Sequence, residues 1–383
     1  MVRYLKDEEL GAAVRLADQI FRAGQRKSMG LSLPKVFSRS LKQGLGCFVG
    51  DRLVSFAGMV PSVVRVKSSK LSVYSYGAVC TASAYRGQGY ATKVLEYAKQ
   101  SAQKSKTSLL FVSGELPIYI EAGLRTFGEW NHCTFFSGPT LNRAVAPCQE
   151  IGFREMQGTD WLHVYRIAGS RAVAFEQSIW DLADLIEAGS LAAIRDWEQV
   201  TILVLEGTQV IGFIVLAYNN KAKESNRIGQ VIEWGGAIPA VAYTINQLLS
   251  FYQLSEINWY ISNEDKALVD QSRLENTSCQ KVRNQGTIWI SDAAQLFAEL
   301  VPYWLEHGKH VEEIPCIHTL DEETEEVVIS IGTNVSDPIA MIDLSVYMFG
   351  QEGFSNYANE DFRDKAQPFF PVPLPYTKGL NFV

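Results

Sequence analysis

The sequence has few of the residues that build metal clusters and disulfide scaffolds. Its 383 residues include six cysteines and five histidines, and no two cysteines form a CxxC pair. This scatter matches neither the ligand spacing of zinc sites nor the cysteine density of small disulfide-linked domains. We therefore expect a reduced protein without a metal centre. The cysteines are Cys47, Cys80, Cys133, Cys148, Cys279 and Cys316.

Long apolar runs are also missing. No segment reaches the roughly 20 apolar residues that a membrane-spanning helix needs. The first eight residues, MVRYLKDE, carry charges where a secretory signal needs an apolar stretch. The net charge of −7 gives no bulk attraction to nucleic acid or anionic lipid, and it suits a cationic small substrate better. These properties predict a cytoplasmic protein without nucleic acid or membrane as a partner. They are compatible with a homo-oligomer.

What the chain does have is hydrophobic periodicity over its whole length, and 383 residues are enough for two or three domains. Residues 1–148 combine helical spacing with an antiparallel meander, which predicts a mixed α/β fold. Helices are expected over residues 7–21, 89–104 and 118–122, and strands over residues 46–49, 53–57, 63–66, 72–81, 108–112, 125–127 and 133–136.

A second cycle with a similar order of elements predicts a diverged duplication over residues 149–291. Strands are expected over residues 161–167, 201–205, 210–217, 227–234 and 257–261, and helices over residues 172–187, 191–197 and 238–251. Residues 292–383 predict a small α+β domain. Its elements are a helix over 293–307 that contains Pro302, an acidic segment over 321–326, a strand over 327–331 and an extended tail from Pro368.

The strongest chemical signal is the segment Arg86-Gly87-Gln88-Gly89-Tyr90, between a strand and a helix. Glycines allow a sharp turn that presents consecutive N–H groups, and a helix start adds unpaired N–H groups and a positive dipole end. Together they predict a cradle for a pyrophosphate, although a plain turn needs the same glycines. Tyr90 excludes a Walker loop, and the preceding meander argues against a dinucleotide fold.

This segment resembles the Q/R-x-x-G-x-G/A motif of the GNAT superfamily of N-acetyltransferases. Downstream, Tyr119 to Leu124 is similar to the tyrosine segment of that family, and residues 108–112 with Ser113 occupy the place of its fifth strand. The resemblance implies an acetyl-CoA site in a mostly antiparallel GNAT fold. The implied cofactor-binding residues are Val79, Cys80, Thr81, Arg86, Gly87, Gln88, Gly89, Tyr90, Ala91, Thr92 and Ser113.

The tandem layout is similar to the enhanced intracellular survival acetyltransferases, in which a GNAT domain precedes a degenerate copy and a sterol-carrier-like domain. The resemblance implies a catalytic GNAT domain over residues 1–148, a degenerate GNAT-like domain over 149–291 and a sterol-carrier-like domain over 292–383. In the second cycle no Arg or Gln precedes spaced glycines, and Pro239 removes one N–H from the helix start. We therefore expect this copy to bind no cofactor.

The resemblance implies Tyr119 as the general acid toward the CoA sulfur, with a core tyrosine as the alternative. It also implies that the Val383 carboxylate acts in the active site, with a tail that only covers a domain seam as the alternative. Glu115 and Glu121 are further candidates for the base. Cys80 is expected to be a small core residue.

Two further functions remain open beside the leading one. The leading prediction is an acetyl-CoA-dependent N-acetyltransferase that transfers acetyl to a primary amine of a small or peptidic acceptor, without a metal. The alternative is a non-catalytic acyl-CoA-binding regulatory protein. A longer-chain acyltransferase is a third reading, since tandem domains with a terminal carboxylate also resemble N-myristoyltransferases.

Overall fold

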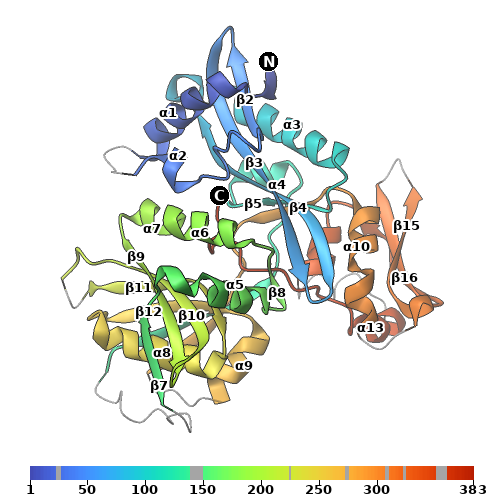
Figure 1. Cartoon of the computed structure of the whole chain (residues 1–383). Helices are drawn as coiled ribbons and strands as arrows, with labels where there is room; N and C mark the ends of the chain where they lie inside the picture. Colours follow the sequence, from blue (N-terminus) through green and yellow to red (C-terminus); the bar gives the residue numbers. More distant parts are fainter. Residues whose placement is uncertain are drawn as a thin grey trace.

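The computed structural model describes residues 1–22, 27–138, 150–223, 226–271, 276–306, 310–321, 325–350 and 360–383. Within these ranges the strands form three sheets, two of seven strands and one of four. Figure 1 shows the first sheet above the second, with the third to one side. Helices and mostly antiparallel strands alternate along the chain, so the predicted mixed α/β fold is confirmed.

The first sheet has the order β1-β2-β3-β4-β5-β14, and β8 pairs with the far end of β3. Gly50, with φ of +56°, makes the turn between β2 and β3. The long β3–β4 hairpin is antiparallel, whereas β4 and β5 are parallel. The strands are β1 (Val2–Tyr4), β2 (Gly44–Val49), β3 (Arg52–Val66), β4 (Ser69–Thr81), β5 (Leu109–Val112), β8 (Val173–Phe175) and β14 (Thr287–Ile290).

Amphipathic helices flank this sheet because their apolar residues recur once per turn. Helix α1 buries Ala13, Leu16 and Ala17, and α3 buries Val94, Leu95, Ala98 and Ala102. Pro117 begins α4, where its missing N–H costs no helical hydrogen bond. The helices are α1 (Leu10–Phe21), α2 (Met29–Ser32), α3 (Tyr90–Lys104) and α4 (Pro117–Glu121).

The second sheet has the order β13-β6-β12-β11-β10-β9-β7. Its β11 and β12 are parallel and are connected through α8, just as β4 and β5 of the first sheet are connected through α3. The strands are β6 (Glu129–Phe136), β7 (Ile151–Glu155), β9 (Glu198–Glu206), β10 (Gln209–Tyr218), β11 (Ile228–Gly236), β12 (Glu256–Ile261) and β13 (Thr277–Arg283). The helices are α5 (Trp161–Gly169), α6 (Ile179–Ala188), α7 (Ser190–Arg195), α8 (Ile238–Phe251) and α9 (Asn263–Gln271).

The two large sheets exchange strands along the chain. Strand β6 follows the first-sheet elements in sequence but pairs with β12 and β13 of the second sheet. Strand β14 follows the second-sheet elements but pairs with β5 of the first sheet. A division of the chain between residues 148 and 149 therefore does not follow the sheets, and that point lies outside the described residues.

The C-terminal part packs on the first sheet. Trp304 and Tyr347 share one apolar core with Val64, Leu109 and Ile288 of that sheet. The Glu299 carboxylate also accepts the Ser72 N–H at 2.9 Å, which fastens α10 to β4. The elements are α10 (Ala293–Leu305), β15 (Cys316–Asp321), β16 (Glu326–Ile331), β17 (Asn334–Val335), β18 (Ile339–Ala340), α11 (Leu344–Phe349) and α13 (Glu360–Ala366). Part of the predicted acidic segment, residues 322–324, lies outside the described ranges.

Two predictions for the second cycle are wrong. The expected strand over residues 161–167 is helix α5, whose start is fixed by Asp160, which pairs with Arg154 and accepts the Gln157 N–H. A segment of seven residues can fit the periodicity of a helix and that of a strand, so its length did not decide between the two. The expected helix over residues 172–187 is split into β8 and α6, because residues 173–175 pair with β3.

The expectation of unpaired cysteines is also wrong. Cys133 of β6 and Cys279 of β13 face each other in the ladder and form a disulfide. Their separation of 146 residues hides the pairing in the sequence. Cys47 and Cys80 are buried and free, and Cys316 is exposed and free. Cys148 lies outside the described residues.

Candidate active site

The loop before α3 is open to solvent. Gly87 and Gly89 have φ of +73° and +74°, in the left-handed region that other residues rarely adopt. A Cβ built on either glycine would meet no atom within 4 Å. No side chain in the described structure therefore occupies the space in front of these glycines, and an external group can approach the backbone closely.

The start of α3 presents unpaired N–H groups beside this loop. Within the helix, the Lys93 N–H donates to the Gly89 carbonyl at 3.1 Å, so the N–H groups of the preceding turn have no helical acceptor. The first turn carries no acidic side chain that would compete for the positive end of the helix dipole. Arg86, Gly87, Gln88, Gly89 and Thr92 are exposed, and Tyr90 and Ala91 are half-buried. Such an arrangement can hold an anion.

Strands β4 and β5 separate in front of this loop. They pair in parallel from Val73 with Leu109 up to Tyr76 with Val112, and β4 then continues alone on that side as far as Thr81. On its other side β4 has a bulge opposite Ala57, where Ala78 takes a φ of +52°. The edge over residues 79–81 can therefore accept an added extended chain. Below, we call this opening between β4 and β5 the fork.

Cys80 lies in this strand but is unsuited to nucleophilic chemistry. Its side chain is buried, and burial raises the pKa of the thiol to about 12. A thiol needs to ionise before it becomes a strong nucleophile. Cys80 is part of the apolar core that also contains Phe56 and Val60, as expected from the sequence.

The last residue of the sequence reaches the fork. The Ser113 hydroxyl, just after β5, donates to the Val383 carbonyl oxygen at 2.5 Å. Val383 also lies against Gly77, where a Cβ would come within 2.3 Å of the Val383 carbonyl carbon. Figure 1 shows the C-terminus between the first sheet and helices α6 and α7. Two residues predicted from the sequence, Ser113 and Val383, are thus in direct contact.

Tyr119 lies on α4, on the β5 side of the fork. Its side chain is buried, and burial raises the pKa of its phenol to about 12. The ring packs against the backbone next to Ser113, because a Cβ on Gly114 would be 3.0 Å from its Cε2 atom. A phenol with a raised pKa stays protonated at neutral pH and can donate a proton or a hydrogen bond.

The other proposed bases are placed less favourably. Glu115 accepts the Gly286 N–H at 3.2 Å and so serves the junction with β14. Glu121 is exposed on α4. Within the described residues no group of three His, Cys, Asp or Glu side chains has the arrangement of a metal site.

A cleft lies near Val383. A cavity of about 710 Å³ lies between β3 and helices α5 and α6. Lys35 and Ser62 line it, and they also line a smaller cavity that contains Val383. Two ion pairs lie among its lining residues, with the Lys35 Nζ 2.8 Å from an Asp181 carboxylate oxygen and the Lys70 Nζ 2.7 Å from a Glu176 carboxylate oxygen. The larger cavity has room for a small acceptor, whereas the smaller one beside Val383 measures about 10 Å³.

The equivalent helix start in the second sheet is closed. Gly236 precedes α8 with a φ of +106°, and a Cβ there would lie 2.1 Å from the Ile211 carbonyl oxygen. The Ala237 N–H already donates to that oxygen at 3.1 Å. Pro239 removes a further donor. This helix start offers none of the open backbone found at Gly87 and Gly89.

Sequence reasoning missed Gly77. A glycine inside a strand rich in Val and Tyr is a recognised sign that another backbone approaches closely. That sign was present in residues 72–81. It points to the position where Val383 rests.

Comparison with known proteins agrees with this geometry. Residues 1–127 match the family model described as acetyltransferase (GNAT) domain. This match confirms, for residues 1–127, the resemblance to the GNAT superfamily that the loop motif indicated. No curated protein matches the sequence.

Solved structures extend the likeness in fold to the whole chain. A GCN5-related N-acetyltransferase from Anabaena variabilis has a TM-score of 0.70 at 11% identity, with 98% of each chain covered. One from Kribbella flavida has a TM-score of 0.63 at 13% identity, covering 100% of this chain and 98% of the other. Eis1 from Mycobacterium abscessus has a TM-score of 0.59 at 14% identity, covering 88% and 84%. At these identities the likeness concerns the fold.

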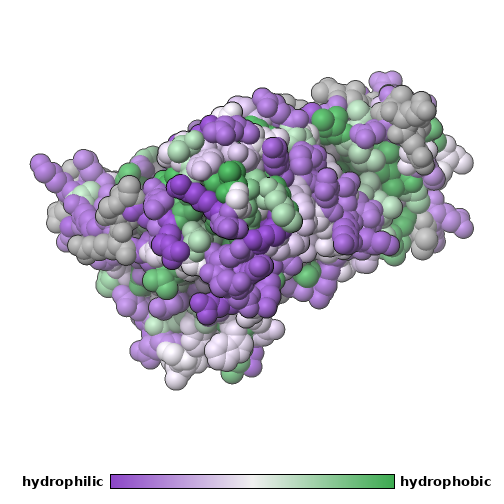
Figure 2. All heavy atoms as spheres, turned by 90° about the horizontal axis from the view of Figure 1, so that it is seen from above, coloured by the Kyte–Doolittle hydropathy of each residue, from purple (hydrophilic) through white to green (hydrophobic). Residues whose placement is uncertain are grey.

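The described residues contain no helix with the length and apolar character needed to cross a membrane. The face seen from above in Figure 2 is mainly hydrophilic, with hydrophobic residues in separate groups.

Proposed function

We propose that this protein is an acetyl-CoA-dependent N-acetyltransferase that acetylates a primary amine of a small or peptidic acceptor by direct attack on the thioester. The observation that carries the proposal is the alignment of three features on one sheet: an open anion cradle, a fork between parallel strands and a buried phenol beside it. GNAT domains perform acyl transfer, and each of these features supplies one requirement of that chemistry.

In this proposal the cradle holds the pyrophosphate of the acyl donor. The N–H groups of residues 87–92 donate to it, and Arg86, exposed at the same turn, adds a positive charge. The pantetheine arm extends along the backbone of Val79, Cys80 and Thr81 like an added strand. No metal takes part in this arrangement.

The acceptor enters from the cleft beside Lys35 and Ser62. The Val383 carboxylate removes a proton from the attacking amine, and Tyr119 delivers a proton to the departing thiolate. The second sheet contributes α5 and α6 as a wall of the cleft and binds no cofactor. We retain the division into domains over residues 1–148, 149–291 and 292–383 as part of the proposal, with β6 and β14 exchanged.

The test is turnover of acetyl-CoA with a panel of primary amines, read out as thiol release, together with calorimetry of CoA binding. We expect Tyr119→Phe to lower kcat by about 10²–10⁴-fold while CoA affinity stays unchanged. Tight CoA binding without turnover by any amine would favour the alternative, a non-catalytic acyl-CoA-binding regulatory protein. A series of CoA thioesters of increasing chain length tests the choice of acetyl.

A further inference from the structure

The chain end crosses the second sheet on its way to the fork. The Asn284 side chain donates to the Pro375 carbonyl at 2.9 Å and accepts the Thr377 N–H at 3.2 Å. Tyr376 stacks on Tyr260 of β12 with ring centroids 4.5 Å apart. These contacts fix the segment at residues 375–377, well before Val383. Something nearer the end has to fix the last residues.

Glu233, near the end of β11, contacts the tail close to its last residues. Its carboxylate faces the backbone N–H of Leu380, which favours the charged form of Glu233, and it accepts the N–H of Trp234 at 3.3 Å. The path of the tail keeps close to it, because a Cβ on Gly379 would be 3.6 Å from its Oε2 atom. Only three residues separate Leu380 from the end, about 10 Å of extended chain. The Phe382 N–H folds this piece back by donating to the Gly379 carbonyl at 3.2 Å.

Arg171 pairs with this carboxylate and favours its charged form. The two side chains form an ion pair, and they are only 18% and 16% exposed for Arg171 and Glu233. Burial raises the pKa of Glu233, and the charge and hydrogen bond of Arg171 offset part of that shift. The guanidinium also lies over the Trp234 ring, 4.7 Å from its centroid. An ionised acceptor makes a stronger hydrogen bond to the Leu380 N–H than a neutral one.

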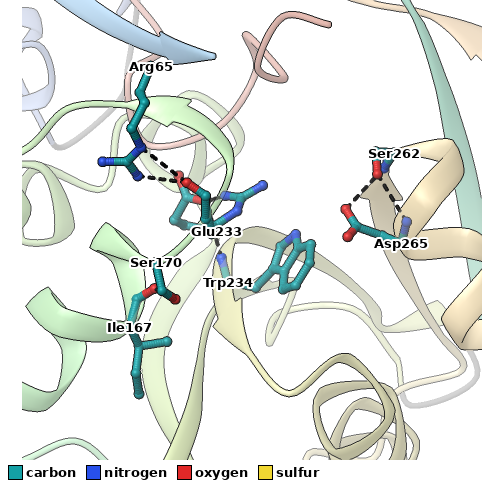
Figure 3. A network of polar contacts seen from close by, with 8 residues as sticks. Arg65, Ile167, Ser170, Glu233, Trp234, Ser262 and Asp265 are labelled. Carbon is teal, nitrogen blue, oxygen red and sulfur yellow. Dashed lines mark hydrogen bonds and ion pairs between the residues drawn. The ribbon is translucent and has the colours of Figure 1, made fainter. Parts of the chain in front are cut away.

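The pair is also fastened to the first sheet. Arg65 of β3 donates to the Arg171 carbonyl oxygen from Nη2 at 2.7 Å and from Nε at 3.2 Å. Figure 3 shows Arg65 extending toward Glu233, with Trp234 beside them and Ser262 and Asp265 on the far side. The anchor of the tail is therefore connected to the same hairpin whose β4 strand carries Gly77.

We propose that Glu233, together with Arg171, is a positioning pair that fixes Leu380 and thereby holds the Val383 carboxylate against Gly77 and Ser113. This inference rests on the proposed function, in which Val383 acts on the amine. It assigns the second sheet a part in catalysis that does not require it to bind a cofactor.

Substitution of Glu233 by Gln tests the proposal. We expect Glu233→Gln to lower kcat about 10-fold or more, because small displacements of a reacting group are costly, while the KM for acetyl-CoA stays within about twofold. Hydrogen exchange of residues 376–383 should become faster in the same variant. The matched control is Asp160→Asn, which breaks a comparable ion pair with Arg154 in the same part of the chain but does not touch the tail.

A second variant covers the case in which Glu233→Gln leaves Arg171 uncompensated and the protein unfolds. Glu233→Met with Arg171→Met removes both charges and keeps the side-chain volume. We expect it to fold and to show the same loss of kcat and faster exchange. Unchanged exchange and kcat in the folded variants, or an equal kcat loss in Asp160→Asn, would overturn the inference.

Deletion of Val383 separates this inference from the proposed function. In a chain without Val383 the Glu233→Gln change should lower kcat no further, since both changes act on the same carboxylate. Full turnover after the deletion would overturn the assignment of Val383 as the base. Low turnover after the deletion with normal turnover in Glu233→Gln would overturn the positioning role alone.

Discussion

The Val383 carbonyl carbon lies 2.3 Å from the point where a Cβ on Gly77 would stand. No side chain, not even a methyl group, fits between β4 and the chain end. The two residues are far apart in sequence, and the contact depends on the tail being led across the second sheet.

We predict that Gly77→Ala displaces Val383 from the fork. The added methyl group overlaps the chain end, which can move away, so the protein should fold while kcat falls about 10- to 100-fold. Steady-state kinetics and calorimetry with CoA will check this, with CoA affinity expected to stay close to that of the parent. The control is Gly152→Ala on β7, where a Cβ meets no atom within 4 Å and kcat should not change.

We predict that Gly89→Ala weakens CoA binding about 10-fold. The change forces a residue with a side chain into φ of +74° at the start of α3, at a cost of about 1–2 kcal/mol. Gly50→Ala is the matched control, because Gly50 has φ of +56° and equally open surroundings but lies in the β2–β3 turn. Both variants should lose similar stability in urea. Equal CoA affinity in the two variants would contradict the role of the loop.

We predict that Asp160 makes the fold sensitive to acid. The hydrogen bonds and charge of Arg154 lower the pKa of this carboxyl to about 2. Between about pH 2 and pH 4 the Asp160 carboxyl is therefore ionised in the folded protein and protonated in the unfolded chain. Its contribution, about 2 kcal/mol, is present above pH 4 and is lost as the pH falls toward 2. Urea unfolding of Asp160→Asn should show this deficit at pH 7 and a shrinking deficit below pH 4. A deficit that does not change with pH would contradict it.

We predict that the Cys133–Cys279 disulfide stabilises the second sheet. Its loss in Cys133→Ser with Cys279→Ser should lower the free energy of unfolding by about 2–5 kcal/mol. A reducing agent should lower the stability of the parent by a similar amount and leave the variant unchanged. Urea unfolding with and without reductant measures both effects.

The local features of this structure were predicted correctly from the sequence. The loop at Gly87 and Gly89, the helix after it and the tyrosine on α4 were all predicted, because each depends on a short run of neighbouring residues. The contact of Ser113 with Val383 joins residues far apart in the chain, and the resemblance to a family supplied only the idea that the chain end enters the site.

Pairings between segments that lie far apart in the sequence could not be predicted from it. Residues 173–175 become a strand only because β3 lies beside them, and residues 161–167 fit a helix as well as a strand. Glu233 gave no signal, because in the sequence it is one acidic residue at the end of a strand. The role of Glu233 depends on its neighbours Arg171 and Leu380, which are distant from it in the sequence.

The exchange of β6 and β14 has a consequence for biosynthesis. As the polypeptide leaves the ribosome, β5 is complete by residue 112, yet its outer neighbour is not made until residue 290. The nascent acetyltransferase domain thus waits with an unpaired strand edge while about half of the protein is translated. Val383 is made later still, so the contact with Gly77 and Ser113 forms only after β14 has been translated.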